Sequence, residues 1–190
     1  MNTNFKNVQT YVDGFRGYEF IKWLNEKGWD ERIIEMFDDI DLPVIQKCWT
    51  SILYQLPIVL VINHDKNHKD MEILDNYREI DSLMRIYGAR PGIELYFDPK
   101  SCELALESND GKYFPLKDIY DTFVMTQRQE EIKSWDISEE EKQLLIDNMN
   151  VVNSRMQQFY ITIRIVESRP KYNESVVQSL KEFYKELNKK

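Results

Sequence analysis

The sequence predicts a single α+β domain, mostly helical, with a small antiparallel sheet over residues 93–114. Three observations support this class. Most of the chain spaces its apolar residues three and four apart, as amphipathic helices do. Two short segments within 93–114 alternate by twos around a turn, and residues 58–62 form an unbroken apolar run after a proline. That run is a candidate further strand of the same sheet.

The composition limits the classes of function. With 42% hydrophobic residues in 190, the chain can bury a core and is not a disordered polymer. A net charge of -8 disfavours binding to nucleic acids or to anionic membranes, so neither is expected as a partner. Two cysteines at apolar positions, with no signal-peptide pattern at the start of the sequence, are typical of a cytoplasmic protein.

The first 40 residues predict short helices. Residues 8–15 have helical apolar spacing, but Gly14 and Gly17 interrupt it, so this end is expected to be a loosely docked arm. Helices are expected over 18–28 and 30–40. With the next helix they resemble a DNA-binding helix-turn-helix in order, but acidic neighbours would repel phosphate, and plain packing is the favoured interpretation.

Residues 41–62 form the densest apolar segment. Asp41 can cap a helix, and Pro43 suits its first turn because the missing N–H donor would be unpaired there anyway. The apolar stripe runs from Val44 to Leu56. Pro57 then favours a buried strand over 58–62, with a kinked, continuing helix as the alternative.

The middle of the chain predicts a helix, a hairpin and a second helix. Residues 73–87 carry a seam at alternating four and three spacings, with a solvated face that includes Asp81 and Arg85. Residues 93–97 and 102–107 flank a turn and predict a hairpin, which 112–114 would extend to a three-stranded meander. A further helix is expected from Pro115 onward.

The last third predicts helices. Residues 126–137 are mostly polar and are a candidate hinge between an α+β part, 18–125, and a helical part, 138–190. Ser138 followed by Glu141 makes a capping box. The seam that follows continues to residue 166, which favours helix over strand for 159–166 although that stretch is β-branched. A last amphipathic helix is expected over 173–187.

One segment could hold a metal ion. His64, Asp65 and His68 have the one-turn histidine spacing of two-histidine zinc sites, and would serve a metal-dependent hydrolase or nuclease. The zincin pattern places Glu directly after the first histidine, and here that position is Asp65. A solvated loop is therefore the favoured interpretation, with no cofactor, and zinc binding is the alternative.

No phosphate loop, serine elbow or paired cysteine nucleophile is found in the sequence. Acidic runs and aromatic residues remain, and together they predict a non-enzymatic inhibitor, immunity or regulatory protein that binds a basic protein surface. Core packing and ordinary solvation are the competing explanations, and a homodimer through the helix seams is compatible with each. The candidate partner-binding residues are Trp29, Trp135, Asp38, Asp39, Asp136, Glu139, Glu140 and Glu141.

Overall fold

A computed structural model describes residues 8–26, 28, 33–34, 39–64, 71–90, 92–108, 111–168, 178 and 182. Within them the predicted α+β class is confirmed: helices predominate and accompany one sheet of four strands and one of three. The helices expected over 30–40 and 173–187 fall largely outside the described residues. No helix in the described ranges is both long enough and apolar enough to cross a bilayer.

The four-stranded sheet has the order β1-β7-β2-β3. Its strands are β1 (Val8–Arg16), β2 (Ile58–His64), β3 (Met71–Asp75) and β7 (Tyr160–Ser168). β7 pairs antiparallel with β1 and parallel with β2, and β3 pairs antiparallel with β2. The predicted strand at 58–62 is therefore present, but it belongs to this sheet and not to the one at 93–114.

Two helical predictions were wrong because their segments pair with each other. The residues predicted as a helix at 8–15 form β1, and those at 159–166 form most of β7. In β7 the side chains of Ile161, Ile163 and Ile165 are buried while Tyr160 and Arg164 are exposed, which is the period of two that a half-buried strand requires. The β-branched pattern was the correct signal in this stretch.

The predicted helix at 73–87 is also two elements. Residues 71–75 form β3, and α4 (Tyr77–Ile86) begins after Asn76. The positive φ of Asn76, 63°, ends the extended backbone of the strand before the helix starts. Ile73 pairs with Ile62 in the sheet instead of continuing the helical seam. A strand followed at once by a helix can imitate a four-and-three spacing over so short a length.

The core helix is as predicted. In α3 (Leu42–Tyr54) the Asp41 side chain accepts a hydrogen bond from the Val44 N–H at 3.2 Å, and Pro43 lies in the first turn. The predicted apolar stripe is buried at Ile45, Cys48, Trp49 and Ile52. Leu56, the last position of that stripe, is 50% exposed because the helix has already ended.

The small sheet consists of β4 (Tyr96–Phe97), β5 (Leu104–Ala105) and β6 (Phe114–Pro115). All pairs are antiparallel, as predicted. β4 lies in the centre, however, with order β5-β4-β6, whereas a meander would place β5 there. The chain therefore crosses from one edge to the other between residues 105 and 114.

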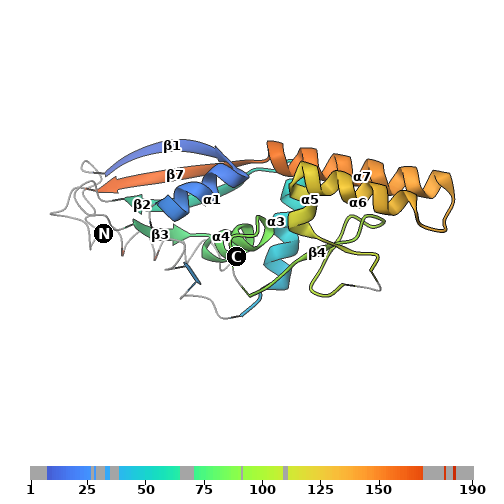
Figure 1. The fold of residues 1–190 in the computed structure, drawn as a ribbon. Helices are drawn as coiled ribbons and strands as arrows, with labels where there is room; N and C mark the ends of the chain where they lie inside the picture. Colours follow the sequence, from blue (N-terminus) through green and yellow to red (C-terminus); the bar gives the residue numbers. More distant parts are fainter. Residues whose placement is uncertain are drawn as a thin grey trace.

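The remaining helices are α1 (Gly17–Glu26), α5 (Leu116–Tyr120), α6 (Thr122–Lys133) and α7 (Glu139–Gln158). One of the two hydrogen bonds of the predicted capping box is confirmed, because the Ser138 hydroxyl accepts from the Glu141 N–H at 3.2 Å. Figure 1 shows α6 and α7 side by side, running away from the end of the four-stranded sheet. Most of the segment 126–137 lies in α6, and a hinge there stays a prediction.

Gly14 and Gly17 differ in how strongly the neighbouring side chains would resist an added Cβ atom. A Cβ at Gly17 would lie 2.1 Å from the Tyr87 ring, whose hydroxyl donates to the Met156 carbonyl at 3.0 Å. A Cβ at Gly14 would lie equally close to Tyr160, but that ring is 55% exposed and can turn aside. We expect Gly17→Ala to cost about 1–3 kcal/mol in unfolding free energy, and Gly14→Ala less than about 1 kcal/mol.

Urea unfolding followed by circular dichroism measures both variants. Equal losses of unfolding free energy, or a larger loss for Gly14→Ala, would contradict this expectation. They would show that the hydrogen bond of the Tyr87 hydroxyl does not hold the Tyr87 ring against Gly17, the first residue of α1.

Candidate functional site

The predicted partner-binding residues do not form one surface. Asp136 and Glu139 to Glu141 lie between α6 and α7 or in the first turn of α7, at the end of the helical pair. Asp39 lies before α3, where it pairs with Arg78 at 3.2 Å. Trp29 and Asp38 are outside the described residues. The acidic residues near α7 are thus the part of the prediction that can be placed on a surface.

Trp135 is held in place by its neighbours. Its backbone N–H donates to the Ile132 carbonyl at 3.0 Å, which fixes the backbone of Trp135 just after α6. The ring stacks on Phe114 of β6 with centroids 5.9 Å apart and planes at 16°. The Arg128 guanidinium lies 5.8 Å from the Phe114 centroid and is bonded to Asp118. The indole is therefore a fixed, half-buried side chain.

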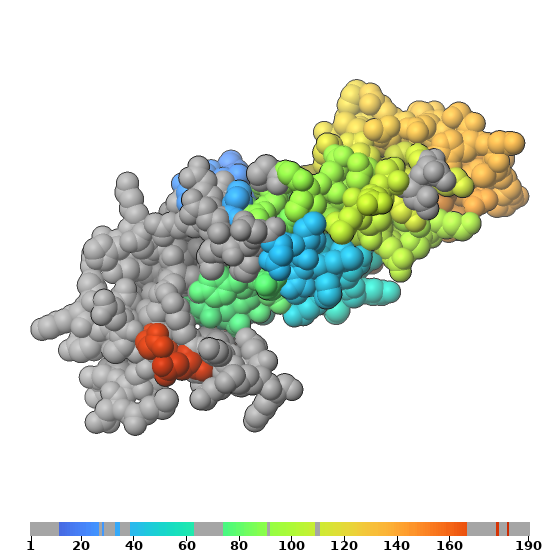
Figure 2. Space-filling view, turned by 90° about the horizontal axis from the view of Figure 1, so that it is seen from below, coloured from blue at the N-terminus to red at the C-terminus, as the bar shows by residue number. Residues whose placement is uncertain are grey.

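A groove of about 240 Å³ opens beside this tryptophan, and we call it the Trp135 groove. Three segments form it: the turn before β5, the residues before β6, and the start of α7. Figure 2 shows these segments, yellow-green and orange, meeting at one end of the molecule. The lining residues are Asp98, Pro99, Lys100, Lys112, Tyr113, Trp135, Ile137, Glu141 and Leu145.

Charges at the Trp135 groove are mixed, with an acidic excess. Glu141 pairs with Lys100 at 3.2 Å, and Glu139 pairs with Lys142 at 2.7 Å. Asp136 and Glu140 are exposed and make no ion pair with the described residues. The charges of the lining itself are balanced, with Asp98 and Glu141 against Lys100 and Lys112. The acidic excess comes from residues that flank the lining in the sequence, Asp136, Glu139 and Glu140 against Lys142.

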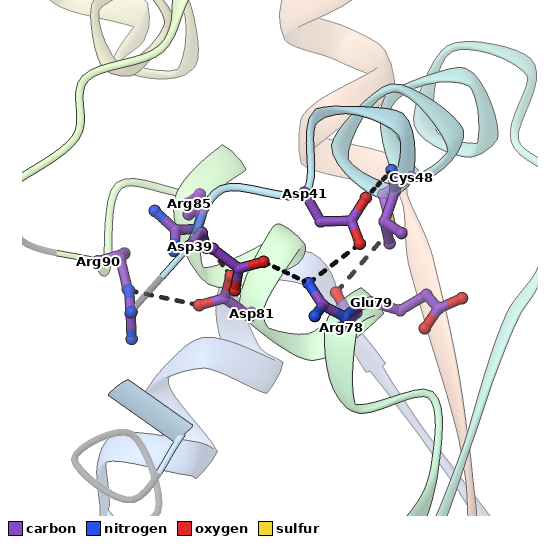
Figure 3. A network of polar contacts seen from close by, with 9 residues as sticks. Asp39, Asp41, Cys48, Arg78, Glu79, Asp81, Arg85 and Arg90 are labelled. Carbon is purple, nitrogen blue, oxygen red and sulfur yellow. Dashed lines mark hydrogen bonds and ion pairs between the residues drawn. The ribbon is translucent and has the colours of Figure 1, made fainter. Parts of the chain in front are cut away.

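A second site was missed by the sequence analysis. Asp81 and Arg85 were predicted on a solvated face of a helix, but they are only 5% and 3% exposed. Arg85 Nε donates to Asp81 Oδ2 at 2.7 Å, and Arg90 Nε lies 3.3 Å from Asp81 Oδ1. Figure 3 shows both arginines directed at the same aspartate. The available signal was the four-residue spacing of Asp81 and Arg85, which surface pairs share.

These arginines adjoin a pocket of about 380 Å³, which we call the arginine pocket. The end of α4, the residues leading to β4 and the start of α5 form its wall. At the rim, the Lys117 ammonium donates to Glu94, and Tyr96 donates to the other oxygen of that carboxylate at 3.0 Å. The Lys117 hydrogen bond lowers the pKa of Glu94, so the carboxylate remains charged to more acidic pH.

The metal hypothesis is only partly placed. His64 is the last residue of β2, opposite Met71 of β3 and Glu167 of β7, while Asp65 and His68 lie outside the described residues. In the parts of the chain that are described, no three His, Cys, Asp or Glu side chains gather as a metal site would require. Zinc binding at this segment stays a prediction, and elemental analysis of protein purified without chelator decides it.

The cysteines are both free thiols. Burial raises the pKa of Cys48 to about 12, and burial also raises the pKa of Cys102. Since the thiolate is the nucleophile, neither side chain is prepared for covalent catalysis. This agrees with their interpretation as small apolar residues.

Comparisons with known proteins give no assignment: no family model matches the chain, and neither a curated protein nor a solved structure is significantly similar to it.

Proposed function

We propose that this protein is a non-enzymatic interaction module that binds a basic segment of a partner protein, with the Trp135 groove as the docking point. A regulatory or inhibitory role in a reducing cytoplasm suits such a module and its two free thiols. The observation that carries the proposal is a fixed indole in the lining of a groove, next in sequence to exposed acidic residues.

The chemistry of the occupant follows from the walls. Trp135, Ile137 and Leu145 offer a small apolar recess that suits one aliphatic or aromatic side chain. Because the indole is already immobilised by Phe114, little side-chain entropy would be lost when a partner packs on it. Rigid aromatic side chains of this kind often contribute most of the binding energy at an interface.

The charge around the recess favours a cation next to that apolar side chain. Asp136 and Glu140 are exposed and can meet Lys or Arg of a partner without first breaking an ion pair to the described residues. Lys100 is neutralised by Glu141, and among the described residues Lys112 has no carboxylate partner. A segment with basic residues flanking one apolar anchor fits this arrangement.

A random-peptide library panned on the immobilised full chain tests the proposal. We expect enriched peptides to carry Lys or Arg beside an aromatic or aliphatic residue, and to bind Trp135→Ala at least about tenfold more weakly than the original chain. Glu140→Lys should also weaken binding. Glu26→Lys at the end of α1 is the matched control, since it makes the same change in net charge and should leave the affinity unaltered.

Peptides without basic residues, or peptides that bind Trp135→Ala and Glu140→Lys as tightly as the original chain, would contradict the proposal. If Trp135→Ala is unfolded, Ile137→Ser tests the same recess, because Ile137 lines it without stacking on Phe114.

A further inference from the structure

One edge of the four-stranded sheet is formed by β1, and every second residue of β1 directs its backbone groups away from β7. The Gly17 N–H donates to the Phe159 carbonyl at 3.0 Å, which continues the pairing of β1 with β7 by one residue. In an antiparallel pair, residues that bond the neighbouring strand alternate with residues that do not. The odd-numbered residues of β1 therefore bond β7, and the N–H and C=O groups of its even-numbered residues point outward.

Two of these outward N–H groups are occupied by side chains. The Gly14 N–H donates to Asp13 Oδ1 at 2.8 Å, and the Arg16 N–H donates to Glu19 Oε2 at 3.0 Å. Charged side chains at a sheet edge prevent the addition of another strand, and here they also occupy the donors that such a strand would need. The C-terminal half of this edge is therefore closed.

The N-terminal half of the edge, residues 8–12, is open. Within the part of the chain that the structure describes, β7 is the one strand beside β1, and no side chain bonds the N–H of Val8, Thr10 or Val12. Val12 is 63% exposed, so solvent reaches the edge at this point. The sequence VQTYV carries no charge and consists largely of residues that favour strands. An uncovered strand of this kind is a template for another strand.

The sequence of the open half indicates what that other strand is. VQTYV is nearly palindromic, so a second copy that runs antiparallel about Thr10 would bring Thr10 opposite Thr10 and Val8 opposite Val12. Threonine pairs and pairs of β-branched residues across strands are favourable, and no like charges meet. Because all these positions direct their backbone groups outward, about six hydrogen bonds would join the copies. A pair centred on Val12 instead would need the Gly14 N–H, which Asp13 already occupies.

We propose that two copies of this chain pair antiparallel through residues 8–12 of β1 and join their four-stranded sheets into one continuous sheet. This contact is closed by a two-fold axis, whereas pairing of β1 with the opposite edge, β3, would propagate from copy to copy. The interface is small, so the dimer is weak and reversible. Since α6 and α7 run away from the sheet (Figure 1), the Trp135 groove of each copy stays open, and the pairing does not depend on what that groove binds.

Sedimentation velocity of the full chain over about 1–500 µM tests the pairing. We expect the weight-average mass to rise from that of one chain toward that of two, with no larger species. Thr10→Pro should lower the association constant at least about tenfold, because proline lacks the outward N–H and is tolerated at a sheet edge in the single chain. Thr10→Val is the matched control, since it keeps the N–H and the β-branched shape and should dimerise like the original chain.

Circular dichroism of dilute Thr10→Pro checks that the single chain keeps its fold. If this variant is unfolded, Val12→Lys tests the same edge. A lysine at this exposed position leaves every backbone donor in place, but two lysines in each dimer would oppose the addition of a strand.

Hydrogen exchange tests the register. At concentrations where the dimer predominates, the amides of Val8, Thr10 and Val12 should exchange at least about tenfold more slowly than in dilute solution. The amides of Gly14 and Arg16, which already bond carboxylates, should not change. The proposal is overturned by a chain that stays single at every concentration, by a dimer that survives both Thr10→Pro and Val12→Lys, or by added protection confined to Gly14 and Arg16.

Discussion

Replacing Asp81 by alanine is expected to lower the unfolding free energy by about 3–5 kcal/mol, because it leaves two buried guanidinium groups without their shared carboxylate. Asp81 accepts from Arg85 Nε at 2.7 Å and lies 3.3 Å from Arg90 Nε. The three side chains are nearly inaccessible to water, so solvent cannot replace the lost charge. Removing one partner of an exposed ion pair lowers the unfolding free energy by only about 0–1 kcal/mol.

Equilibrium denaturation with urea measures this loss, and Asp39→Ala is the control. Asp39 pairs with Arg78 near the same helix, but its side chain is 65% exposed. If Asp81→Ala costs no more than Asp39→Ala, the two arginines must reach water after the substitution, and the buried network would not be a stability element.

The burial of Asp81, Arg85 and Arg90 could not be predicted from the sequence. The four-residue spacing of Asp81 and Arg85 is readable, but such pairs usually lie on exposed helix faces. Asp81 and Arg85 are buried because residues distant in the chain cover them. One of these is Asp39, whose carbonyl accepts a hydrogen bond from Arg85. Arg90 comes from beyond the helix end. Local sequence carries no record of these contacts, so the pocket could only be found from the structure.

Elements with local signals were predicted well. The caps at Asp41 and Ser138 depend on side chains three residues from the N–H groups they accept from, and both hydrogen bonds are present. By contrast, β1 has no internal strand signal strong enough to overcome its helical spacing. Its conformation comes from pairing with β7, about 150 residues later, through the register Val8 to Ser168 and Arg16 to Tyr160.

Trp49→Ala is expected to cost about 3–5 kcal/mol, for a different reason: it removes the largest side chain of the core and leaves a cavity. Trp49 is 2% exposed, and its ring meets the Phe97 ring edge-on with 6.2 Å between the ring centroids. Its indole Nε1 also donates to the Cys102 carbonyl at 2.8 Å. The side chain thus joins α3 to the small sheet, whose connections line both the Trp135 groove and the arginine pocket.

Trp49→Phe helps to separate the two contributions, because it keeps a six-membered ring in the core but loses the hydrogen bond and a smaller part of the volume, at a cost of about 1–3 kcal/mol. Chemical unfolding gives the two free energies, and hydrogen exchange at Phe97 and Leu104 reports whether the small sheet loosens. Equal losses for the two variants would assign the effect to the Cys102 carbonyl instead of the cavity. Because Asp98 follows the central strand of the small sheet and lines the Trp135 groove, Trp49→Ala should also weaken peptide binding there.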